Sequence, residues 1–167
     1  MRREVVLLWC PKTAPYGEAF YQAAFQPSAP MLQLATTAAR IQEASHIEQF
    51  ISRLDASESA VAVMADPFLA SHRKLVIEHV ARRQLVTVYP WAYFVRDGGL
   101  ISYGVDQADM FRRSASYVDR LLRGEQAGSL PVQGPVKFEL GVNLRTAKAL
   151  RIEVPESLLL LADELIE

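Results

Sequence analysis

Short apolar runs alternate along this chain with segments whose apolar residues recur at helical spacing. Three runs have the length and β-branched content of buried strands, and they cover residues 60–65, 85–89 and 100–103. Residues 72–83, between the first two runs, are predicted to form a helix with Ser71 as its N-cap. This order is typical of a parallel sheet with right-handed crossovers.

The same pattern predicts elements on both sides of this central stretch. Ser45 and Glu48 have the spacing of a capping box, and Asp106 or Asp109 is expected to begin a later helix. The further predicted strands are 4–9, 31–35 and 137–142, and the further helices are 16–26, 45–54, 106–123, 143–150 and 155–166. Phe20, Ala23 and Ala24 are expected on the apolar side of the helix 16–26. The order favours one three-layer α/β/α domain over residues 1–167, flavodoxin-like, with a mainly parallel sheet. Its predicted core includes Val6, Leu8, Val61, Val63, Val86 and Val88.

Several polar and aromatic residues are expected at the carboxyl ends of the predicted strands. In parallel sheets, the loops beyond these ends line the ligand crevice. The residues at such positions are Asp66, Pro67, Pro90, Trp91, Tyr103 and Asp106.

Composition and charge narrow the function classes. Half of the 167 residues are apolar, and the net charge is −1 with both signs interspersed, so neither nucleic acid nor an anionic membrane is an expected partner. The only cysteine, Cys10, cannot form an internal disulfide. No membrane insertion is expected, because no apolar run is long enough to span a bilayer, and the run 5–9 is too short for a signal peptide.

Catalytic motifs do not stand out. Asp66 lacks the acidic pair that a phosphoacceptor aspartate needs after the first strand, where Cys10 stands instead. Ser71 and His72 are helical neighbours outside any Gly-x-Ser-x-Gly elbow. His46, His72 and His79 have no metal-ligand spacing and are expected on helix surfaces, and no phosphate-binding glycine motif follows the first strand. No cofactor is therefore expected.

Six segments together resemble one family. They are LLWCPKTAPYGEAF, VMADPF…SHR, VYPWAYFVRDGGLISYGVD, FRRSASYVDRLLRGE, LPVQGPVKFELGVNLRTAKAL and VPESLLLLADELIE. They resemble the substrate-binding proteins of ABC importers related to the tryptophan/tyrosine-binding group. The resemblance implies a class I, LIVBP-like periplasmic binding fold, in which two α/β lobes close over a small ligand. It implies that residues 1–102 form most of the second lobe, that the helix 106–124 packs on the first lobe, and that residues 136–167 return with a C-terminal helix.

The resemblance also implies a location and a partner. The family is periplasmic and delivers its solute to an ABC permease, whereas this sequence carries neither a first lobe nor an export signal, which would mean a cytoplasmic chain if it were complete. Ligand contacts are expected from Tyr16, Asp66, Pro67, Tyr89, Tyr103 and Asp106. Rings and carboxylates at these positions suit the side chain and the ammonium of an amino acid. Helix capping is an equally good interpretation of Asp66 and Asp106.

The leading hypothesis is therefore noncatalytic binding of a small organic solute, with an amino acid as the favoured class. A free-standing cytoplasmic sensor or interaction module and an enzyme on a flavodoxin-like sheet remain alternatives. The helix 106–123 carries an apolar stripe, and the loss of its covering lobe predicts a homodimer or a swapped assembly. The stripe consists of Phe111, Ala115, Val118 and Leu122, with Met110 and Leu121 beside it, and Phe111, Val118 and Leu122 are the expected contacts.

Overall fold

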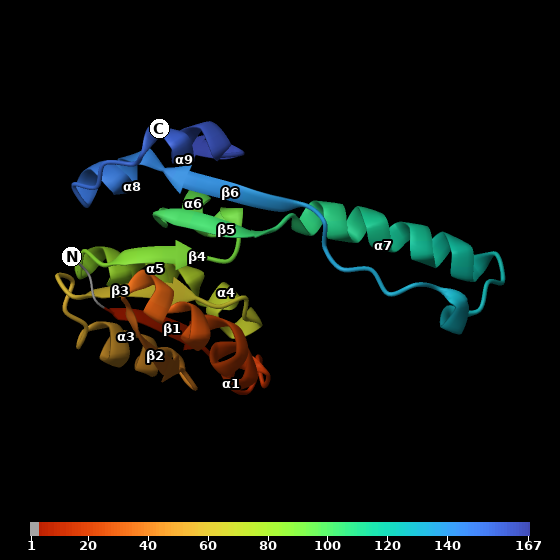
Figure 1. Cartoon of the computed structure of the whole chain (residues 1–167), viewed down its shortest axis with the longest axis horizontal. Coiled ribbons are helices and arrows are strands. Elements are labelled where there is room, and N and C mark those ends of the chain that lie inside the picture. The colour runs from red at the N-terminus through yellow and green to blue at the C-terminus, as the bar shows by residue number, and fades with distance from the viewer. Residues whose placement is uncertain (1–3) are drawn as a thin grey trace.

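A single sheet organises the part of the chain that the computed structural model describes, residues 4–167. Seven strands in this part have the order β2-β1-β3-β4-β5-β6-β7, and all neighbours are parallel except β5 and β6 (Figure 1). The strands are β1 Glu4–Trp9, β2 Ala35–Arg40, β3 Ser59–Val63, β4 Val86–Tyr89, β5 Ile101–Val105, β6 Phe138–Asn143 and β7 Glu164–Ile166. The predicted mainly parallel α/β architecture is confirmed.

Helices lie on both faces of this sheet. The α-helices are α1 Gly17–Phe20, α2 Gln26–Ser28, α3 Ala44–Ile51, α4 Pro67–Ser71, α5 Arg73–Arg82, α6 Ala92–Arg96, α7 Gln107–Leu122, α8 Leu144–Ala149 and α9 Glu156–Leu161. A π-helical segment, η1 Tyr21–Phe25, joins α1 to α2, and the 3₁₀ turns are η2 Pro30–Leu32 and η3 Ala127–Ser129.

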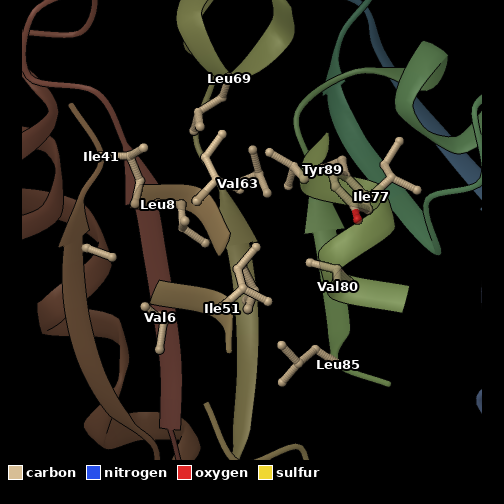
Figure 2. Packing of buried hydrophobic residues seen from close by; sticks show 14 of the residues in the cluster. Val6, Leu8, Ile41, Ile51, Val63, Leu69, Ile77, Val80, Leu85 and Tyr89 are labelled. Carbon is tan, nitrogen blue, oxygen red and sulfur yellow. The ribbon is translucent and has the colours of Figure 1, made fainter. Parts of the chain in front are cut away.

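The larger core lies between the sheet and helices α3, α4 and α5 (Figure 2). Val6, Leu8, Val61 and Val63 point into it, as predicted, because alternate residues of a strand face the same side. On the other face, Leu7 and Trp9 pack against Tyr21 of η1. β1 is therefore buried on both faces, which explains its unbroken apolar run.

Strand β4 corrects part of the predicted core. Val88 is 41% exposed and Val86 is only partly buried, whereas Leu85, Thr87 and Tyr89 are buried. The apolar run 85–89 contains too few polar residues to reveal which alternate set faces inward, and the prediction chose the wrong set.

The segment 16–40 differs most from prediction. The predicted strand 31–35 is wrong, because Pro30–Leu32 forms a 3₁₀ turn, Gln33 has a left-handed φ of 55° and β2 begins only at Ala35. The predicted apolar side of the preceding helix is also wrong. Phe20 and its partners Ala23 and Ala24 are exposed, and Gly17 and Tyr21 face the sheet instead.

Helix boundaries also need correction. Ser71 lies in the last turn of α4, where its hydroxyl donates to the Phe68 carbonyl, so it does not cap α5. Likewise Ser45 lies inside α3, because that helix begins at Ala44. His79 is buried, not on the surface. The last predicted helix ends at Leu161, and the chain then forms β7 beside β6, where pairing with a neighbouring strand satisfies its backbone.

Helix α7 stands apart from the layers (Figure 1). It leaves the sheet after β5 and extends beyond it, and the following residues run back beside the helix to β6. Asp106 is the N-cap of α7 and was one of the two residues predicted to begin this helix. None of the residues of α7 is buried.

Candidate functional site

The candidate site lies along the edge of the sheet where β1, β3, β4 and β5 end. These strands are mutually parallel, so the loops that follow them lie side by side at one edge. Most of the residues predicted to bind a ligand belong to these loops.

Asp66 organises the first two of these loops. Its carboxylate is fully buried and accepts hydrogen bonds from the Cys10 amide at 2.8 Å and the Thr13 hydroxyl at 2.9 Å. It also caps α4, where the amides of Phe68 and Leu69 donate to it at 2.7 and 3.1 Å. With both oxygens occupied, Asp66 holds the loop after β1 against the loop after β3. In this structure Asp66 is thus a helix cap, as one of the two interpretations expected.

Pro67 supports the same turn. It occupies the first position of α4, where a missing amide hydrogen costs nothing and a fixed φ suits the helix. Its ring is exposed at the edge beside the buried Asp66.

Asp106 has the equivalent role at the start of α7. Its carboxylate accepts from the Asp109 amide at 3.0 Å and from the Lys137 ammonium at 2.8 Å. These donors stabilise the charged form, the Lys137 hydrogen bond most strongly, and they lower the pKa of the Asp106 carboxyl group. The Lys137 pKa is raised for the same reason. The pair also joins the end of β5 to the residue before β6.

Tyr89 does not reach the edge as a ligand contact would need to. Its ring is 1% exposed and stacks on Phe94 with centroids 5.0 Å apart, and burial raises the pKa of its hydroxyl. Tyr89 is therefore a core residue in this structure, and its contact with a ligand stays a prediction.

Trp91, two residues further on, is half-buried at the edge, where it packs against the core. Its ring packs on Tyr93 and Phe94, with centroids 5.6 and 6.3 Å apart. Gly104 of β5 makes this possible, since a Cβ there would lie 1.8 Å from the Pro90 carbonyl oxygen. The close approach of the two backbones fixes the loop that carries Trp91.

Two hollows meet at Trp91. The first, of about 240 Å³, also contains the side chains of Arg96, Asp106 and Glu139. The second, of about 210 Å³, continues along α7 past Met110 and Phe111. Aromatic, cationic and anionic groups therefore surround one small volume, which suits a zwitterion with an apolar side chain.

Tyr16 and Tyr103 flank this edge. Tyr16 is 81% exposed in the loop before α1, and Tyr103 is 61% exposed on β5, where it stacks on Phe138. Because β3 and β4 lie between β1 and β5, their strands are roughly 14 Å apart at the usual strand spacing. The structure therefore places them on either side of the edge.

Sequence reasoning missed Arg96, Lys137 and Glu139. Arg96 ends α6 in a run that reads as part of a turn, and the other two follow the long excursion through α7. Only the antiparallel pairing of β6 with β5 brings Glu139 beside Gly104. No local pattern signals that pairing.

A further hollow lies away from this edge. It measures about 260 Å³ and lies between α5 and α8, near Leu85 and Leu100 at the beginnings of β4 and β5. Its wall is mostly apolar, and it is separate from the loops that follow the parallel strands.

Within residues 4–167, no group of three or more His, Cys, Asp or Glu side chains could hold a metal ion. The Ser71 hydroxyl lies 3.2 Å from His72 Nδ1, yet both groups also contact the Phe68 carbonyl oxygen, a local arrangement at the end of α4. None of the helices in this part of the chain has the length and apolar character to cross a bilayer.

Solved structures of low sequence identity share the fold of this chain. A conserved domain protein from Vibrio cholerae superposes with a TM-score of 0.86 at 20% identity, covering 98% of this chain and 54% of that one. The ABC domain of a Streptococcus pneumoniae protein in complex with L-Trp gives 0.84 at 21% identity, covering 98% and 56%. A ligand-free, open substrate binding protein with adhesive properties from Clostridium difficile gives 0.69 at 17%, covering 98% and 54%. The chain thus spans about half the length of these proteins.

The sequence itself matches a family model. A search of curated proteins found no match. The model of the ABC transporter substrate binding protein family, however, matches residues 4–166, nearly the whole chain. The chain therefore belongs to the ABC transporter substrate binding protein family.

Proposed function

We propose that this chain forms one wall of a solute-binding cleft that serves an ABC importer, and that its solute is an amino acid with an aromatic side chain. The observation that carries the proposal is the hollow shared by Trp91, Arg96 and Glu139. The L-Trp complex of the Streptococcus pneumoniae protein supports the ligand class. Membership of the family supports a periplasmic location and delivery to an ABC permease as parts of the same proposal.

The three side chains match the three parts of such a ligand. The Trp91 ring offers a face for stacking, held in place by Tyr93. Arg96 binds Glu164 through Nε and Nη2, which leaves the donors of Nη1 for a ligand carboxylate. Glu139 supplies a carboxylate for the ammonium, whereas Asp106 is already bound to Lys137.

The remaining residues at the edge shape the wall. Tyr16 and Tyr103 extend the aromatic surface on either side, and Asp66 and Pro67 hold the loops in position. Binding requires no bond to be made or broken, so the proposed activity is noncatalytic. Because a clamp gains affinity by burying its ligand on two sides, this wall alone is expected to bind weakly, with a Kd of about 1 mM or more.

Nuclear magnetic resonance titration of the chain with an amino-acid panel tests the proposal, because it detects weak binding. Tryptophan or tyrosine should shift the Trp91 indole resonance and the backbone amide resonances around the hollow. Glu139→Gln should remove both shifts, and Trp91→Ala, which has no indole to observe, should remove the amide shifts. Glu58→Gln, at an exposed position remote from the hollow, is the matched control for Glu139→Gln. Shifts that map elsewhere, or no response to any panel member, would contradict the ligand assignment. Turnover of a substrate that is lost on changing Asp66 or His72 would contradict the noncatalytic part.

A further inference from the structure

The hollow between α5 and α8 reaches into the larger core. Five apolar side chains that line it are each at most 8% exposed, and they belong to α5, to β4 and to the residues just before β4 and β5. They are Ile77, Val80, Leu85, Tyr89 and Leu100. Figure 2 shows the first four of them in the same part of the core. We call this space of about 260 Å³ the α5–α8 hollow.

Hydrogen bonds hold α8 in place as one wall of this hollow. The Asn143 side chain caps α8 by accepting from the Thr146 amide at 2.9 Å, and its own amide group donates to the Val95 carbonyl at 3.1 Å. The Thr146 hydroxyl donates to the Gly98 carbonyl at 2.9 Å. These bonds join α8 to α6 and to the turn before β5. The α5–α8 hollow is therefore formed without a ligand, as small-molecule sites usually are.

The rim of the α5–α8 hollow is positively charged. Arg145 lines the hollow, and Lys148 and Arg151 follow it on α8 and just beyond. Among residues 4–167, none of these three forms an ion pair, and no carboxylate lines the hollow. The other polar side chains there, Gln84 and Thr146, are neutral. An anionic group at the mouth would therefore meet cations and no competing carboxylate.

We infer that the α5–α8 hollow is a second ligand site, which binds a small monocarboxylic acid with a compact apolar body. The apolar body lies beside Tyr89 and Leu100, and the carboxylate pairs with the Arg145 guanidinium at the mouth. Sites for drug-sized molecules measure about 300–1,000 Å³, so a hollow of about 260 Å³ suits a smaller molecule, such as an aromatic acid. Because none of the described carboxylates lines the hollow, an ammonium group finds no partner there, and a zwitterionic amino acid is disfavoured.

The α5–α8 hollow is separate from the hollow at Trp91. Trp91 follows the carboxyl end of β4 and α7 begins after β5, whereas Leu85 and Leu100 precede these two strands. Figure 1 shows α8 and α7 at opposite ends of the molecule. The α5–α8 hollow therefore stays open whatever packs on α7, and binding at the two hollows is expected to be independent.

Titration of the 167-residue chain with benzoate, followed through its methyl resonances by nuclear magnetic resonance, tests the site. Benzoate should shift the methyl resonances of Val80, Leu85 and Leu100 with a Kd of about 1–10 mM, as for a very small ligand. Benzamide has nearly the same shape without the charge, and it should bind about fivefold more weakly, the factor that an exposed ion pair contributes. Equal affinity for the two probes would overturn the assignment of an anionic ligand.

Removal of one charge tests the role of Arg145. Arg145→Gln should raise the Kd for benzoate about fivefold and leave that for benzamide unchanged, which a purely structural role would not do. Arg53→Gln is the matched control, since Arg53 is exposed just after α3, does not line the hollow and has no ion pair among residues 4–167. Equal effects of the two changes on benzoate binding would contradict the contact with Arg145.

Filling the hollow tests its position. Ala149→Trp places a large ring at the wall and should abolish the methyl shifts with both probes, whereas Ala115→Trp, on the exposed α7, should preserve them. Circular dichroism verifies that each variant folds. Methyl shifts that persist in Ala149→Trp, the absence of any saturable shift, or shifts confined to the Trp91 indole would overturn the inference. None of these outcomes bears on the proposed solute binding, which the amino-acid titration judges separately.

Discussion

The Thr13 hydroxyl donates a hydrogen bond to Asp66 at 2.9 Å, across a gap of 53 residues in the chain. Together with the bond from the Cys10 amide to the same carboxylate, it fastens the loop after β1 to the loop after β3. The candidate site therefore begins with a buried charge that is fully used inside the protein. Both the stability and the shape of the candidate site depend on Asp66.

Asp66→Asn is expected to lower the free energy of unfolding by about 2 kcal/mol, because the amide nitrogen would face a donor where the carboxylate accepted. Urea denaturation measures the change. Glu58→Gln, the same charge removal at an exposed position, should stay within about 0.5 kcal/mol of the parent. Equal stability of the two variants would show that Asp66 does not hold the loops.

Acid should weaken the junction between Asp106 and Lys137. The folded-state pKa of Asp106 is lowered, so its contribution to stability is complete above its unfolded pKa of about 3.9 and disappears as the pH falls through the folded value. Asp106→Asn should consequently be less stable than the parent at neutral pH, and the difference should shrink below about pH 4. Urea denaturation at several pH values measures it. If the stability difference between Asp106→Asn and the parent grew on acidification, the lowered pKa of Asp106 would be contradicted.

Gly104→Ala should be strongly destabilising, since the new Cβ would collide with the Pro90 carbonyl oxygen. Overpacking of this kind costs about 1–3 kcal/mol, and here the obstacle is backbone, which relaxes poorly. Thermal unfolding monitored by circular dichroism gives the loss. At Gly128, where a Cβ meets nothing within 4 Å, the same change is the control and should be tolerated. Similar melting temperatures for both variants would contradict the close approach of β4 and β5.

Val61 and Val88 offer a matched test of which side chains face the core. Val61 is buried at 1% exposure on β3 and Val88 lies exposed on the neighbouring β4. Val61→Ala should cost about 2 kcal/mol, and Val88→Ala less than about 0.5 kcal/mol. Guanidinium denaturation of both variants decides it, and a larger loss at Val88 would refute the observed register.

The parts of the fold that sequence predicted well are those with strong local signals. The unbroken apolar run of β1 and the β-branched run of β3 indicated buried strands, and Val6 and Val61 are core residues as expected. Asp106 signalled the beginning of α7 by its capping chemistry. In each case the residues that carry the signal are neighbours in the chain.

The parts that sequence missed depend on distant contacts. The small and polar residues of β2 gave little apolar signal, yet the strand pairs with β1 over its whole length. The residues 164–166 become a strand only because β6 offers an edge. Arg96 and Glu139 join one hollow through that same tertiary pairing of β5 with β6. Local patterns contain no information about such partners.

The Asp106–Lys137 contact has a consequence for the topology of the chain. The Asp106 amide donates to the Lys137 carbonyl while their side chains form an ion pair, so the excursion through α7 leaves and rejoins the sheet at one point. On the sheet side of that point, β5 and β6 pair as the two arms of a hairpin. Residues 107–136 are therefore an insertion between the two strands of this hairpin. A chain in which a short turn replaces them should still unfold cooperatively in urea, and loss of that cooperativity would show that the excursion is part of the folding unit.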